Sequence, residues 1–143
     1  MWAIAATIGI ILTVTALVHL YWALGGLWPA NSPGELAQTV IGEPGREKLP
    51  PPLVTVSVAG LILAAGFIPA LHLADIPSVL PDWLSHGTLW LLAFVFISRG
   101  AVTYLWVTKA EKLTEPFRTL NFRYFSPLCL ILGTGFAILV MFS

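Results

Sequence analysis

Arg99 is the residue in this sequence best placed to do chemistry, because it is a charge set inside a long apolar stretch. Residues 94–98 before it and 100–105 after it are mostly apolar. At the centre of a membrane helix, a charged side chain costs roughly 2.5–3.5 kcal/mol, so it requires a partner or a water-filled cavity. Arg99 therefore either holds an anionic or polar head group or extends its side chain to the membrane surface, about two turns away.

His19 is the second candidate, near the end of the first apolar stretch. Helical spacing produces two faces, one with Thr15, His19 and Trp22 and the other with Arg99, Thr103 and Trp106. If these faces meet, they form a polar pocket walled by indole rings. The alternative is that His19 makes one hydrogen bond to a neighbouring helix and contacts no ligand.

Other kinds of site have little support in the sequence. Cys129 is the single cysteine, so no internal disulfide or multi-cysteine metal site is expected. His72 and His86 belong to the opposite end of the apolar stretches from His19, which argues against paired haem ligands. The apolar stretches contain no carboxylate, and no His, Cys, Asp and Glu cluster predicts a metal site. We expect no catalytic residue, and the zero net charge argues against nucleic acid as a partner.

The elements that must position these residues are membrane-spanning helices. Of the 143 residues, 57% are hydrophobic and 10% are charged, against about 25% charged in soluble domains. Crossing a bilayer takes roughly 20 mostly apolar residues. The stretches that meet this length are 2–24, 53–72, 83–107 and 125–142. We predict an all-α, four-helix integral membrane bundle that forms one domain over residues 1–143, with the first stretch retained as a helix.

The distribution of basic residues predicts the orientation of this bundle. All the lysines and arginines outside the apolar stretches lie in two connections: Arg46, Lys48, Lys109, Lys112, Arg118 and Arg123. Basic residues favour the cytoplasmic side of a membrane. Connections 25–52 and 108–124 are therefore expected in the cytoplasm, with both termini on the outer side.

The structure of these two connections is open from the sequence alone. Charged residues alternate with apolar ones from 108 to 124, which favours either a helix lying in the head-group region or an ordinary loop. The connection at 25–52 is rich in proline and glycine. It either folds back over the mouth of the bundle or stays loose.

Three stretches of the sequence resemble a known family. They are His-Leu-Tyr-Trp-Ala-Leu-Gly-Gly-Leu-Trp-Pro at 19–29, the Arg99-Gly100 pair, and residues 121–130, which contain Ser-Pro-Leu-Cys. The sequence is similar, over essentially its whole length, to an uncharacterised bacterial membrane family, domain of unknown function 3995. This resemblance implies a four-helix protein of the bacterial inner membrane and supplies no activity, substrate or cofactor. The family has a tyrosine directly before Ser-Pro-Leu-Cys, whereas here Phe125 follows Tyr124.

Our leading hypothesis is a pocket in the cytoplasmic half that binds a lipid-like or quinone-like amphiphile. The candidate ligand-binding residues are His19, Trp22, Arg99, Thr103, Trp106, Asn121 and Tyr124. The alternative is an accessory subunit that stabilises a larger membrane complex through a membrane-protein partner. A third hypothesis is a membrane enzyme acting on a lipid or isoprenoid, since His and Arg can do acid–base and electrostatic work. The sequence leaves the cofactor unknown.

Overall fold

The computed structural model describes residues 1–74 and 81–143, and within them every regular element is a helix. The long helices are α1 (Trp2–Ala23), α3 (Pro52–Ala74), α4 (Asp82–Leu105) and α7 (Ser126–Phe142). The short elements are α2 (Pro33–Val40), α5 (Val107–Ala110), α6 (Phe117–Leu120) and the π-helical turn η1 (Asn121–Phe125). In the described residues, four helices are long and apolar enough to cross a membrane, which confirms the predicted all-α class.

The fourth of these helices begins earlier than the apolar stretch 125–142 indicates. Its helical path is continuous from Phe117 through α6, η1 and α7 to Phe142. The connection at 107–116 contains only the short helix α5, so the segment is neither one long surface helix nor wholly irregular. Because of these extra turns, the fourth helix begins with residues that lie beside the end of α4.

The long helices are arranged as two antiparallel pairs, α1 with α3 and α4 with α7. Glycines permit the close approach within each pair. A Cβ atom at Gly9 of α1 would lie 3.3 Å from the carbonyl oxygen of Gly66 in α3. A Cβ at Gly100 of α4 would lie 2.7 Å from the carbonyl oxygen of Ser126 in α7. Small residues at such crossings bring the backbones of membrane helices together.

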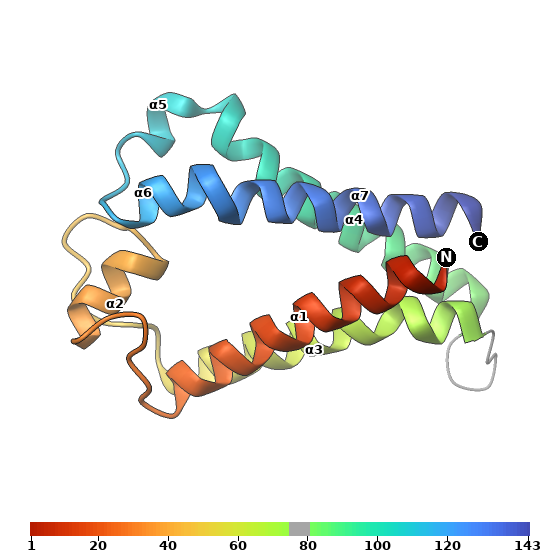
Figure 1. Cartoon of the computed structure of the whole chain (residues 1–143), viewed down its shortest axis with the longest axis horizontal. Helices are drawn as coiled ribbons and strands as arrows, with labels where there is room; N and C mark the ends of the chain where they lie inside the picture. The colour runs from red at the N-terminus through yellow and green to blue at the C-terminus, as the bar shows by residue number, and fades with distance from the viewer. Residues whose placement is uncertain (75–80) are drawn as a thin grey trace.

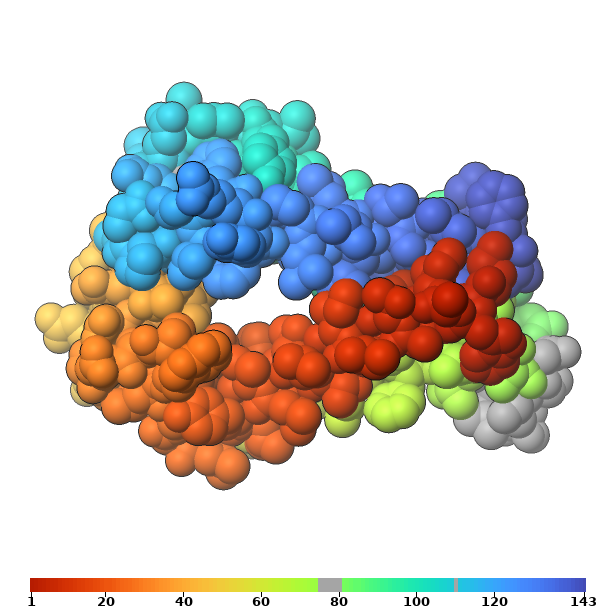
Figure 2. Space-filling view, viewed as in Figure 1, coloured from red at the N-terminus to blue at the C-terminus, as the bar shows by residue number. Residues whose placement is uncertain are grey.

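The two pairs converge at one end and diverge at the other (Figure 1). The end that carries both termini is called here the terminal end, and the end with α2, α5 and α6 is called the loop end. A buried hydrophobic cluster joins the pairs in the terminal half; it contains Ile8, Leu12, Leu89, Leu132 and Phe136. Towards the loop end, the space-filling view shows an opening through the molecule between α1 and α7 (Figure 2).

The connection between α1 and α3 folds against the connection between α4 and the fourth long helix at the loop end. The Ser32 hydroxyl caps α2 by accepting the Glu35 amide at 3.2 Å, which is a preferred way to begin a helix. After α2, the carbonyl of Gly42 accepts the amide of Thr114 at 2.9 Å. Gly42 has a φ of +71°, and a Cβ there would collide with the Phe117 ring. Thus α2 bridges the diverging pairs.

Candidate ligand-binding site

A buried polar cluster links α4 to the start of the fourth helix. The Ser126 hydroxyl lies 2.7 Å from Thr103 Oγ1 and 3.2 Å from Asn121 Oδ1. Asn121 Nδ2 donates to Thr103 Oγ1 at 2.9 Å. These three side chains are at most 2% exposed. Hydrogen bonds between buried polar groups offset the cost of burying them, and here they also hold the Asn121 amide in one orientation.

The π-helical turn η1 explains how Asn121 and Ser126 meet. Residues five apart point about 140° away from each other on an α-helix, but a π turn places them one above the other. The Ser126 amide donates to the Asn121 carbonyl across this turn. Pro127 follows at the beginning of α7 and has no amide hydrogen for the carbonyl of Arg123, while its ring crowds that carbonyl. The widened turn relieves this crowding.

Arg99 extends the cluster towards the surface. Its Nη2 donates to Asn121 Oδ1 at 3.0 Å, so the guanidinium is held by a neutral amide. Arg46 and Arg118, by contrast, each form an ion pair with a glutamate three residues before them in the chain. Within the described residues, Arg99 has no carboxylate partner. Its positive charge is therefore compensated only by amide dipoles and by whatever occupies its surroundings.

A pocket of about 440 Å³ opens over this cluster. Its lining comes from α4, the residue between α4 and α5, α5, the loop between α5 and α6, α6 and η1; it consists of Arg99, Val102, Thr103, Trp106, Lys109, Leu113, Phe117 and Asn121. One side is polar, with Thr103 and Asn121 beside Arg99, and the rest is apolar except for Lys109. A cavity with apolar walls and a few convergent polar groups is typical of small-molecule sites.

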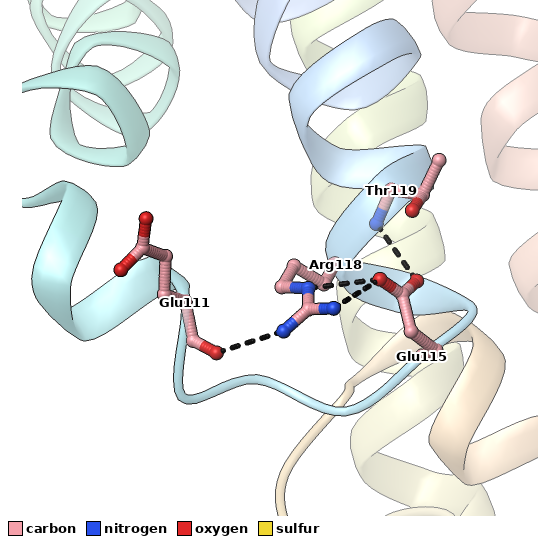
Figure 3. Close-up of polar contacts among 4 residues, drawn as sticks. All are labelled: Glu111, Glu115, Arg118 and Thr119. Carbon is pink, nitrogen blue, oxygen red and sulfur yellow. Dashed lines mark hydrogen bonds and ion pairs between the residues drawn. The ribbon is translucent and has the colours of Figure 1, made fainter.

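The α5–α6 connection, residues 111–116, lies beside this pocket and is held by hydrogen bonds that involve charged side chains (Figure 3). Glu115 accepts the amide of Thr119 at 3.2 Å and pairs with Arg118 at 2.8 Å, while Arg118 also donates to the carbonyl of Glu111. The hydrogen bonds from Thr119, and then Arg118, lower the pKa of Glu115. A carboxylate at the start of a helix also interacts favourably with the helix dipole. These contacts set the position at which α6 begins.

Of the seven predicted residues, the structure brings four around this one pocket: Arg99, Thr103, Trp106 and Asn121. Tyr124 lies on η1 and is 61% exposed, outside the pocket lining. His19 and Trp22 lie on α1, with their rings 5.2 Å apart between centroids. A role in binding stays a prediction for all seven residues.

The contacts of His19 determine which of its ring nitrogens carries a proton. Nδ1 lies 2.8 Å from the carbonyl oxygen of Thr15, and a carbonyl can only accept, so Nδ1 donates. Nε2 of a neutral His19 is then a hydrogen-bond acceptor.

His19 and Trp22 also lie on the face of α1 that turns towards α7. Ile4, Ile8 and Ile11 of this face line a groove against α7, and helical spacing continues the face through Thr15 to His19 and Trp22.

The other two histidines lie at the terminal end, away from the pocket. His72 of α3 and His86 of α4 approach edge to face, with ring centroids 4.7 Å apart. His72 also contacts the hydroxyls of Ser85 and Ser143, at 3.0 and 2.7 Å, and so links α3 to both α4 and the end of α7. In the part of the chain that the structure describes, no group of three His, Cys, Asp or Glu side chains could hold a metal ion.

Sequence reasoning missed five contributors to the pocket or its floor: Val102, Lys109, Leu113, Phe117 and Ser126. Ser126 is part of the recognised Ser-Pro-Leu-Cys stretch, but its contact with Asn121 depends on a π turn that no sequence periodicity reveals. Lys109 lies only four residues beyond the end of α4, and its nearness in sequence to Arg99 and Trp106 could have indicated that it lines the same pocket. Phe117 has the apolar character of a wall residue, but only the fold of the connection shows where it packs.

Comparison with known proteins identifies the family and nothing more. No curated protein and no solved structure matches this chain. A family model described as "Protein of unknown function (DUF3995)" matches residues 12–136, which include the whole pocket lining and all seven predicted residues. This match confirms the resemblance carried by the three motifs. The chain therefore belongs to the DUF3995 family of proteins of unknown function.

Proposed function

We propose that this protein is a membrane-embedded binding protein whose pocket beside the α5–α6 connection holds an amphiphile. The observation that carries this proposal is the convergence of Arg99, Thr103, Trp106 and Asn121 on one cavity. These residues come from two parts of the chain that are separated by the α5–α6 connection. A polar side beside apolar walls matches a molecule with a polar head and a hydrophobic body.

The pocket's polar groups are oriented before any ligand arrives. Asn121 is fixed by Thr103 and Ser126, and it in turn holds Arg99. Side chains that are already ordered lose little conformational freedom on binding, which favours affinity. Trp106 is 54% exposed and supplies a large flat apolar surface at the pocket wall.

We place the loop end, and with it the pocket, on the cytoplasmic side of a bacterial inner membrane. The basic residues of both loop-end connections support this orientation. In that orientation, Arg99 lies in the inner half of the bilayer. An amphiphile could then enter from the inner leaflet with its head towards the cytoplasm.

The test is mass spectrometry of small molecules that co-purify with the protein in mild detergent, together with an absorption spectrum. We expect one amphiphile to be enriched over its share of the membrane. Trp106→Ala should lower its occupancy several-fold, because the apolar wall is lost. Trp90→Ala is the matched control: Trp90 lies on α4, which Trp106 caps, and it is 52% exposed and absent from the pocket lining.

Two results would contradict this proposal. Co-purified lipid in the same proportions as the bulk membrane, unchanged by Trp106→Ala, would show that no amphiphile is selected. A second polypeptide recovered at a fixed ratio, with no enriched small molecule, would instead support an accessory subunit.

A further inference from the structure

We infer that the polar head of the bound amphiphile is an oxyanion, a phosphate or a carboxylate, held between Arg99 and Lys109. This inference rests on the proposed function and goes beyond it by excluding a neutral head such as a quinone. The relevant property of the pocket is its charge: Arg99 and Lys109 are the ionisable groups in its lining, and both are cationic. Among the residues that the structure describes, no acidic side chain lines the pocket beside them.

The contrast with the neighbouring arginine strengthens this inference. Arg118 lies in α6, directly after the α5–α6 connection, and forms an ion pair with Glu115 at 2.8 Å that neutralises its charge. Arg99 is instead bonded to Asn121, an amide that carries no charge. The fold thus supplies a carboxylate to the arginine outside the pocket and leaves uncompensated the one inside it. Arg99 is itself exposed, but it lies within an apolar helix long enough to cross a membrane, and a cation in such a helix is a functional-site candidate.

The geometry of Arg99 also fits an oxyanion. A guanidinium carries five N–H donors in a planar fork that matches the paired oxygens of phosphate and carboxylate. Arg99 donates to Asn121 Oδ1 through Nη2, and within the described residues no hydrogen bond engages its Nη1 or Nε. Because Ser126 and Thr103 fix Asn121, the hydrogen bond from Nη2 restricts the positions that the guanidinium of Arg99 can take.

The rest of the lining argues that the oxyanion belongs to an amphiphile rather than to a free ion. Val102, Trp106, Leu113 and Phe117 present hydrocarbon and aromatic surface beside the two cations. A free phosphate would leave this surface in contact with water, whereas an acyl or isoprenoid chain would cover it. Burial of that surface adds affinity that inorganic phosphate cannot obtain.

The experiment is native mass spectrometry of the protein with three added probes: phosphatidic acid, diacylglycerol of the same acyl chains, and inorganic phosphate. Wild-type protein should retain phosphatidic acid at least tenfold better than diacylglycerol, which has no oxyanion, and inorganic phosphate should not displace it at equal concentration. Arg99→Gln should reduce the preference about tenfold, because the fork is lost. Lys109→Gln should reduce it by a smaller factor, because an ammonium group cannot form the paired hydrogen bonds of a guanidinium.

Lys112→Gln is the matched control, since it removes the same charge three residues further along and does not line the pocket. If Arg99→Gln fails to fold, the comparison of Lys109→Gln with Lys112→Gln still decides. Equal effects of these two lysine variants would overturn the inference and indicate general attraction to anionic lipid. Displacement of the lipid by inorganic phosphate would also overturn it, in favour of a free anion.

The inference and the proposed function fail in different ways. A neutral amphiphile that is enriched, depends on Trp106 and is unaffected by Arg99→Gln would overturn the oxyanion and leave the binding function intact. Loss of all selective retention, for every probe and for co-purified molecules, would remove both.

Discussion

At the scale of the residue, Asn121 has the most connected role in the pocket. Its oxygen accepts from Arg99 and Ser126, and its nitrogen donates to Thr103. An amide is suited to this position because it can accept on one side and donate on the other. It orients Arg99 without cancelling its charge.

Asn121→Asp tests this role with almost no change in shape. The new carboxylate would lie about where Oδ1 now lies, 3.0 Å from Arg99 Nη2, and would form an ion pair with it. We expect a folded protein whose retention of phosphatidic acid falls about tenfold, measured by native mass spectrometry. Unchanged retention would show that Arg99's charge does not act on the ligand.

Asn121→Leu tests the structural part of the same role. It leaves the buried Ser126 and Thr103 hydroxyls and Arg99 without their amide partner. Leaving a buried polar group unpaired costs about 1–3 kcal/mol, so this variant should unfold at a clearly lower temperature than Asn121→Asp in the same detergent. Equal unfolding temperatures for the two variants would contradict the role of the cluster in stability.

At the scale of the element, the site depends on how closely α4 approaches α7 and on where the fourth helix begins. Gly100 and Gly133 lie at the close approach: a Cβ at Gly100 would meet Ser126 and Leu130, and one at Gly133 would meet Ile97. The π turn then presents Asn121 and Ser126 to α4 together. Glu115 and Arg118 stabilise the first turn of this helix.

Gly100→Ala should separate α4 from α7 and destabilise the protein by about 1–3 kcal/mol, because the new methyl group would lie 2.7 Å from a backbone oxygen. Gly60→Ala is the control: a Cβ there meets nothing within 4 Å, and alanine favours helix by up to about 1 kcal/mol. Thermal unfolding in detergent measures both. A Gly100→Ala protein as stable as the Gly60→Ala protein would contradict the close packing.

The α5–α6 connection should loosen in acid. The pKa of Glu115 is lowered in the folded protein by hydrogen bonds from Thr119 and Arg118, so its stabilising contribution is present above the ordinary carboxyl pKa. That contribution is lost as the pH falls through the lowered pKa. We expect the protection of the Thr119 amide from hydrogen exchange, corrected for intrinsic rates, to fall over this range. Glu115→Gln should show weaker protection that does not vary there, and a wild-type-like profile in this variant would exclude Glu115 as the cause.

At the scale of the whole molecule, the two helix pairs share a core near the terminal end and separate towards the loop end. The polar cluster and the pocket therefore lie within one pair, α4 with α7 and the segments that join them, rather than between pairs. His19 and Trp22 belong to the other pair. A ligand that also reached these residues would have to extend across the opening visible in Figure 2.

The orientation of the whole molecule gives a further prediction. In a Cys129→Ser background, a cysteine at Glu47 should react with a membrane-impermeant thiol reagent only from the cytoplasmic side, and one at Ser143 only from the outer side. The basic residues of the two loop-end connections are the physical reason. The reverse labelling pattern would place the pocket in the outer leaflet and contradict the proposed orientation.

The sequence by itself determined the all-α class, the four apolar helices, the Arg99–Trp106 face and the family, because each depends on local composition, helical spacing or motif. It left undecided how the two connections fold, which the contacts of Gly42 with Thr114 and Phe117 decide. Tertiary structure alone placed Asn121 and Ser126 against Thr103, because a π turn shifts the helical phase in a way that regular periodicity does not predict. It also decided that no described carboxylate reaches Arg99: both arginine ion pairs join residues three apart in the chain, whereas no Asp or Glu lies within a helical turn of Arg99, so only the fold could have brought one to it.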